Sequence, residues 1–136
     1  MSGRACSRRF RMRRTSVSAS RRHVETTLDG WGLGGLAEPA ALVVSELATD
    51  AVVHATGVAE FFELTLSCRD GVLVVEVSDS CRWRMPELGK PGPDDLSGRG
   101  LLIVDALAQA WGVRPRDAGK TVWVHLAESE DAERGG

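Results

Sequence analysis

The chain has 136 residues, 43% of them hydrophobic and 26% charged, which suits one globular domain around a single core. No run approaches the ~20 apolar residues of a membrane-spanning helix, and the arginine-rich start leads into no apolar signal-peptide stretch, so we expect a cytoplasmic protein without a membrane segment. The three cysteines, Cys6, Cys68 and Cys81, fit neither a disulfide framework nor a zinc cluster, and we expect them to be reduced.

Basic residues are concentrated at the N-terminal end. Eight arginines and no acidic residue occur through Arg22, whereas all 19 acidic residues follow. Residues 1–17 are predicted to form a disordered basic tail or a leader that precedes the true start; an arm that touches nucleic acid or an acidic partner is the alternative. Residues 18–127 are predicted to form the domain, and residues 128–136 a disordered C-terminal tail.

Two helices are predicted in the first half of the domain. Ser18 to Trp31 begins with a helix-capping residue type and carries Val24 and Leu28 at the spacing of one helical face, before a glycine cluster ends it. Residues 36–55 follow as a second helix that a further glycine closes.

The second half favours strands. Residues 61–68 and 72–78 are rich in β-branched and apolar side chains and are joined by a short turn at Arg69, Asp70 and Gly71, which predicts a hairpin. Residues 82–98 contain several prolines and glycines and predict a long loop. Helical spacing resumes over 101–111, and residues 120–126 alternate like a last strand. The order indicates a two-layer α/β (α+β) sandwich with an antiparallel or mixed sheet.

A polar stripe runs along the second predicted helix. In "ELATDAVVHA", Glu46, Asp50 and His54 are spaced at i, i+4 and i+8 in an otherwise apolar segment. Asp50 is suited to supply an oxygen to a nucleotide-bound magnesium ion, and Glu46, one turn earlier, to act as a base toward an attacking hydroxyl. The alternatives are a solvated helix face for the two carboxylates and an interaction with the helix dipole for His54.

Two further stretches complete a candidate site. Asp79 ends an apolar strand, where its carboxylate would suit an exocyclic amine such as that of adenine; a turn-initiating aspartate is the alternative. Gly98 and Gly100 flank Arg99 at a predicted helix start, where unpaired amide groups favour an anion and glycine lets a phosphate approach. Such a glycine pair more often only makes a turn.

Together these stretches resemble the three sequence boxes of the GHKL ATP-binding superfamily, which includes gyrase, a heat-shock chaperone and sensor histidine kinases. They are most similar to the anti-sigma-factor serine kinase branch, in which the first box reads like "ELVTNAVRHA". "VEVSDS" resembles the second box, and "GRGLLIVDALAQAWG" the third. A final "GKTVW" strand is also typical of that branch, so the resemblance covers about residues 18–126.

The resemblance implies a histidine kinase-like ATPase fold and a role for each matching position. Glu46 would be the general base, Asp50 would stand where the family has its magnesium-binding Asn, and Asp79 would contact adenine. The residues bordering the phosphates would be Gly98, Arg99, Gly100 and Leu101, and Thr121 would serve the adenine site. Two departures matter: Asp50 adds a negative charge that magnesium would have to offset, and the glycines usual after the strand aspartate are missing.

The implied cofactors are ATP and Mg²⁺, and three functions remain open. One is a serine/threonine kinase that phosphorylates an anti-anti-sigma factor. Another is a module without catalysis that sequesters a sigma factor or another regulator. Direct nucleic-acid binding through the basic segment is the third and is not expected, because no recognition-helix signature occurs. The resemblance also makes a homodimer reasonable.

Overall fold

The computed structural model describes residues 3–55, 59–79, 98–116 and 119–127. Strands and helices follow the chain in this order: β1 Arg4–Arg11, α1 Thr15–Gly30, a 3-10 turn Gly34–Leu36, α2 Ala37–Ala55, β2 Phe61–Arg69, β3 Val72–Asp79, α3 Gly98–Leu107, β4 Ala110–Arg116 and β5 Gly119–Ala127. The predicted loop over 82–98 and the predicted tail over 128–136 lie almost entirely outside the described residues. Within the described residues, no helix combines the length and the apolar character needed to cross a membrane.

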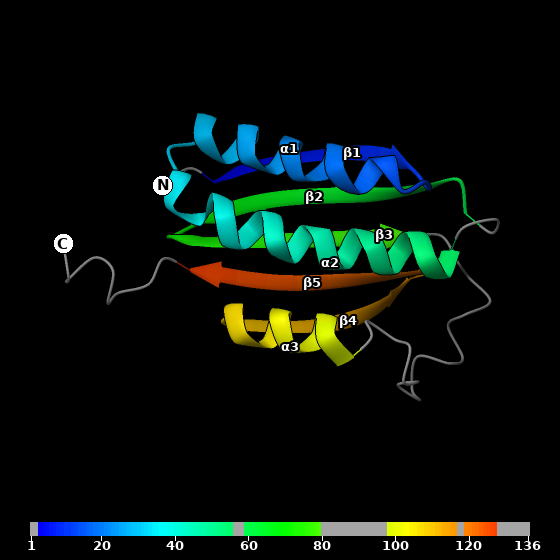
Figure 1. Ribbon diagram of the computed structural model, residues 1–136. Coiled ribbons are helices and arrows are strands. Elements are labelled where there is room, and N and C mark those ends of the chain that lie inside the picture. The colour runs from blue at the N-terminus through cyan, green and yellow to red at the C-terminus, as the bar shows by residue number, and fades with distance from the viewer. Residues whose placement is uncertain (1–2, 56–58, 80–97, 117–118, 128–136) are drawn as a thin grey trace.

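The strands form one five-stranded antiparallel sheet in the order β1-β2-β3-β5-β4. The described α-helices α1, α2 and α3 lie on one face of this sheet, with α2 running along the strands over its middle (Figure 1). The predicted two-layer α/β sandwich is confirmed, and the sheet is antiparallel rather than mixed. Between the layers lies the core, which is built mainly from one face of α1, one face of α2 and the inward residues of β2, β3 and β5.

Alternation along the strands separates the two faces of the sheet. On β3, Leu73, Val75 and Val77 are buried beneath the helices, and on β5, Val122 and Val124 are their counterparts. Because successive side chains on a strand point to opposite faces, Asp79 and Lys120 share the helix-covered face with these valines. The alternation of side chains along β3 and β5 therefore decides which polar residues of the sheet can contact α2.

Local chemistry explains the predicted helix end and hairpin. After α1, the amide of Leu33 donates to the carbonyl of Leu28 at 2.8 Å, and Gly32 takes a φ of 78° that suits glycine. Between β2 and β3, Asp70 and Gly71 both have positive φ, 56° and 80°, as a two-residue hairpin turn requires. Both elements were predicted because these constraints are local.

The N-terminal segment departs from the prediction. Residues 1–17 were expected to be disordered, but Arg4–Arg11 form the edge strand β1, and α1 begins at Thr15. Phe10 is 6% exposed, and its ring stacks on Phe62 at 5.5 Å between centroids. The prediction was wrong because arginine density was taken as a sign of disorder, whereas charged side chains are common on an edge strand.

The strand β4 was not predicted. Helical spacing suggested a helix as far as Trp111, but α3 ends at Leu107, and Trp111 belongs to β4. The indole Nε1 of Trp111 donates to Asp105 Oδ1 at 3.3 Å and so joins the strand to the helix before it. β4 pairs with β5, the next strand along the chain, from Ala110 opposite His125 to Arg116 opposite Gly119, and this pairing overrides the helical spacing of the preceding residues.

We expect Phe10→Ala to lower the free energy of unfolding by about 2–4 kcal/mol, because it leaves a cavity beside Phe62. Arg9→Ala, on the opposite face of the same strand, is the matched control and should change stability by less than about 0.5 kcal/mol. Urea unfolding followed by circular dichroism measures both values. Equal, negligible effects would show that β1 does not belong to the fold.

Candidate functional site

Asp50 is the buried member of the predicted polar stripe. The structure places Glu46, Asp50 and His54 on α2, as the spacing predicted. Asp50 is only 8% exposed, whereas Glu46 is half-buried. A solvated helix face therefore does not describe Asp50, because a carboxylate with so little contact with water requires compensating partners.

Both oxygens of Asp50 face nitrogen atoms. His54 Nε2 lies 3.3 Å from Oδ1, one helical turn along α2. Lys120 lies at the start of β5. Its Nζ is 3.8 Å from Oδ2 of Asp50, and its side chain is only 12% exposed. Lys120 was not predicted as a site residue from the sequence. Its spacing of two and four residues from Val122 and Val124 on the last strand nevertheless indicated that it shares their face of the sheet.

Asp79 lies next to this group. It ends β3, is 6% exposed and stands directly opposite Lys120 across the β3–β5 ladder. Residues opposite each other on antiparallel strands have neighbouring side chains on the same face. Lys120 therefore pairs with the buried carboxylate of Asp50 on α2 and is the ladder neighbour of the buried Asp79 on β3.

Thr121 lies on the other side of the sheet. Its hydroxyl is 2.7 Å from the hydroxyl of Ser78, its partner in the ladder, and Thr121 itself is buried. Strand alternation directs this pair away from the face that carries Asp79 and Lys120. The structure thus brings Asp50, Asp79 and Lys120 together and leaves Thr121 apart, so a role for its hydroxyl beside Asp79 has no support in this geometry.

The predicted phosphate cradle opens α3. Gly98, Arg99 and Gly100 form the first turn of this helix, Leu101 follows, and α3 packs against α2. The first amides of a helix have no partner within the helix and carry a partial positive charge. Helix α3 is ten residues long and is therefore a regular helix rather than an isolated turn.

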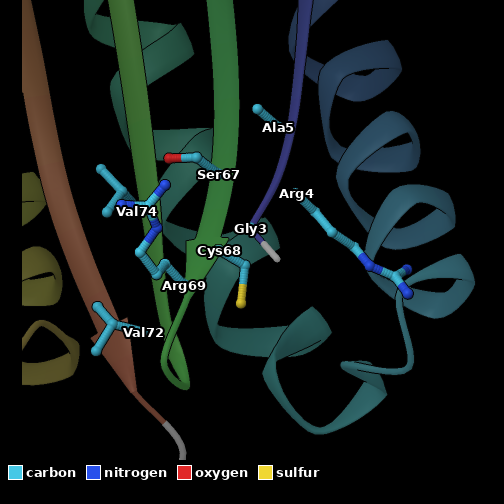
Figure 2. A pocket seen from close by; sticks show the side chains of 8 residues that line it. All are labelled: Gly3, Arg4, Ala5, Ser67, Cys68, Arg69, Val72 and Val74. Carbon is cyan, nitrogen blue, oxygen red and sulfur yellow. The ribbon is translucent and has the colours of Figure 1, made fainter. Parts of the chain in front are cut away.

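A pocket of about 350 Å³ lies at the other end of the sheet. The first residues of β1, the last of β2 and the first of β3 line it, including Arg4, Arg69 and Val72, whereas Asp79 is the last residue of β3. Figure 2 shows that the side chain of Arg4 extends away from the other labelled side chains. The pocket contains no carboxylate and is separate from the group around Asp50.

The donor set near Asp50 fits a metal ion that arrives with a nucleotide. Among the residues that the structure describes, no three His, Cys, Asp or Glu side chains gather into a site that would hold a metal alone. A magnesium ion on a polyphosphate needs only one or two protein oxygens and takes the rest from phosphate and water. Asp50 supplies such oxygens, beside the cation of Lys120.

The comparisons with known proteins agree with this fold. A family model described as the histidine kinase-like ATPase domain matches residues 10–126, so the chain belongs to that family. Domains of this GHKL type bind ATP, typically with magnesium. No curated protein matches the chain.

Two solved structures are similar. The RsbU and RsbW domains of Rv1364c from Mycobacterium tuberculosis give a TM-score of 0.67 at 14% identity, over 91% of this chain and 32% of that one. The histidine kinase domain of the blue-light activated histidine kinase EL346 from Erythrobacter litoralis gives 0.51 at 18% identity, over 86% of this chain and 63% of that one. The chain thus spans less than two thirds of either structure, and the similarity shows a shared fold.

The start of α3 generates a prediction. We expect Gly100→Val to abolish ATP binding in calorimetry, because a branched side chain in the first turn of α3 would block the approach of a phosphate. Gly30→Val is the matched control, since a Cβ at this other helix-end glycine meets no atom within 4 Å. Circular dichroism must show both variants folded. Normal ATP binding by a folded Gly100→Val would mean that the glycines only make a turn.

Proposed function

We propose that this domain binds ATP between α2, the end of β3 and the start of α3. The observation that carries the proposal is the pair of buried carboxylates, Asp50 and Asp79, on the helix-covered face of the sheet in a member of an ATPase domain family. Asp79 accepts a hydrogen bond from the exocyclic amine of adenine, and the amides at the start of α3 face the phosphates. Asp50 would hold the Mg²⁺ that accompanies ATP, and the ion would offset the charge of the phosphates.

We further propose that the protein is a serine/threonine kinase whose substrate is an anti-anti-sigma factor. Glu46 lies one turn of α2 before Asp50, so the two carboxylates are on the same side of the helix, and Glu46 can act as the base if the attacking hydroxyl comes within hydrogen-bond distance of it. In this reaction the serine oxygen attacks the γ-phosphorus, the bond to the leaving ADP oxygen breaks, and Glu46 takes the hydroxyl proton. The RsbW domain in the structurally similar Rv1364c supports this choice of partner.

The second candidate is a module that sequesters a sigma factor and keeps ATP as a structural ligand. The observation that favours it is the engagement of Asp50 with Lys120 and His54, which differs from a carboxylate committed to a metal ion. In that case partner binding persists without phosphate transfer. The two functions share the nucleotide site and differ only in chemistry.

Glu46→Ala distinguishes the two functions. If the protein is a kinase, this variant keeps ATP affinity within a few-fold and lowers phosphate transfer by on the order of 10²-fold or more, because only the positioned base is lost. The measurement is transfer of label from radioactive ATP to a candidate anti-anti-sigma protein. Glu25→Ala, which removes an exposed carboxylate on α1, is the matched control and should keep full transfer.

The sequestering module gives a different pattern. No label would appear on the candidate partner with the wild-type protein, although a pull-down would show an intact complex that Glu46→Ala leaves unchanged. That combination would overturn the kinase assignment. Equal labelling by the wild type and Glu46→Ala would instead contradict the role of Glu46 as the base.

A further inference from the structure

Lys120 is the charged residue of the site that the proposed function does not use. It reaches from β5 to the helix layer, where its Nζ lies 3.8 Å from Asp50 Oδ2, and it stands opposite Asp79 in the strand ladder. Exposed fractions of 12% for the Lys120 side chain and 7% for that of Asp50 place the pair largely out of water. Screening by solvent and salt is weak for such a pair, so the charge of each residue strongly affects the other.

A polyphosphate that enters this site brings several negative charges close to Asp50. The carboxylate would repel these charges unless a cation lies beside it, and the repulsion is strongest where water is excluded. His54 contacts the other oxygen of Asp50 and is a cation only when protonated. Of His54 and Lys120, only Lys120 carries a permanent positive charge.

We propose that Lys120 controls the affinity of the nucleotide site for a polyphosphate, and that it does so by neutralising Asp50 so that an anionic ligand can bind beside a buried carboxylate. This inference rests on the proposed nucleotide site and deepens it. If the Asp50–Lys120 pair determines the affinity for the polyphosphate, the effect of replacing Lys120 must depend on whether Asp50 is present. Lys120 acts through Asp50 and is a positioning residue, with no part in the chemical step.

The coupling is measured by a double-mutant cycle on ATP affinity, using Lys120→Met, Asp50→Asn and the double variant in excess chelator, so that no metal ion replaces the lysine. We expect Lys120→Met alone to weaken ATP binding about tenfold or more, because Asp50 then loses the positive charge that lies beside its Oδ2. The double variant should bind within about threefold of Asp50→Asn alone, because no carboxylate charge remains to be neutralised.

Arg114→Met is the matched control. It removes one positive charge from β4, where the Arg114 side chain is 55% exposed and pairs with Glu76 at 2.7 Å, on the opposite face of the sheet from Lys120. It should leave ATP affinity within about twofold of the wild type, because exposed charges are well screened. An equal loss in Arg114→Met and Lys120→Met would reduce the effect to net charge and overturn the proposal.

Two other outcomes of the cycle also overturn it. If Lys120→Met binds ATP as well as the wild type, the lysine does not control affinity. If Lys120→Met costs the same factor with Asn at position 50 as with Asp, the lysine acts on the nucleotide directly and not through the carboxylate.

Unfolding of the nucleotide-free protein provides a second readout that does not need ATP. Lys120→Met should lower the thermal midpoint of unfolding. Adding Asp50→Asn should restore most of the loss, because the double variant has no buried carboxylate at position 50 to be neutralised. Additive effects of the two changes would overturn the pairing. If the wild type binds no ATP even with Mg²⁺ present, the proposed function fails and the affinity claim fails with it, while the unfolding cycle still decides whether the two residues form a pair.

Discussion

A carboxylate that is removed from water needs positively charged or hydrogen-bonding partners. The buried carboxylate of Asp50 creates this need between α2 and the sheet. Its position on the sheet side of α2 leaves it 8% exposed, with His54 on one oxygen and Lys120 on the other. Meeting this requirement ties the C-terminal half of α2 to the first residues of β5. The same contact fixes where Asp79 lies relative to the helix, because β3 and β5 are neighbours in register.

The sequence predicted the parts of the fold that local chemistry controls. Val24 and Leu28 marked the buried face of α1, and Asp70 with Gly71 marked the hairpin, since each depends on the residues within a few positions. Two edge strands were missed for different reasons: β1 pairs with the distant strand β2, whereas β4 pairs with the next strand along the chain but follows α3 so closely that the helical spacing was continued into it. In β1 the arginines even favoured the opposite prediction, although the single inward ring of Phe10 secures the strand.

The sequence predicted the positions of the candidate residues on their helix and strand, but not the contacts between them. Spacing on one helix was enough to place Glu46, Asp50 and His54 on α2, and strand alternation was enough to bury Asp79. The contact between Asp50 and Lys120 joins residues 70 positions apart and depends on how α2 lies on the sheet. No pattern within one segment contains that packing, and the phase of Lys120 on its strand showed only that it faces inward.

We propose that this sheet face and the start of α3 form an adenine nucleotide site. Calorimetric titration with ATP and with GTP, both with Mg²⁺, tests this proposal most directly. We expect saturable binding of one ATP per chain and an affinity for GTP that is lower by on the order of 100-fold. The reason is that guanine presents a carbonyl oxygen to the carboxylate of Asp79 where adenine presents an amine. Absence of saturable binding of ATP, or equal affinity for the two nucleotides, would contradict it.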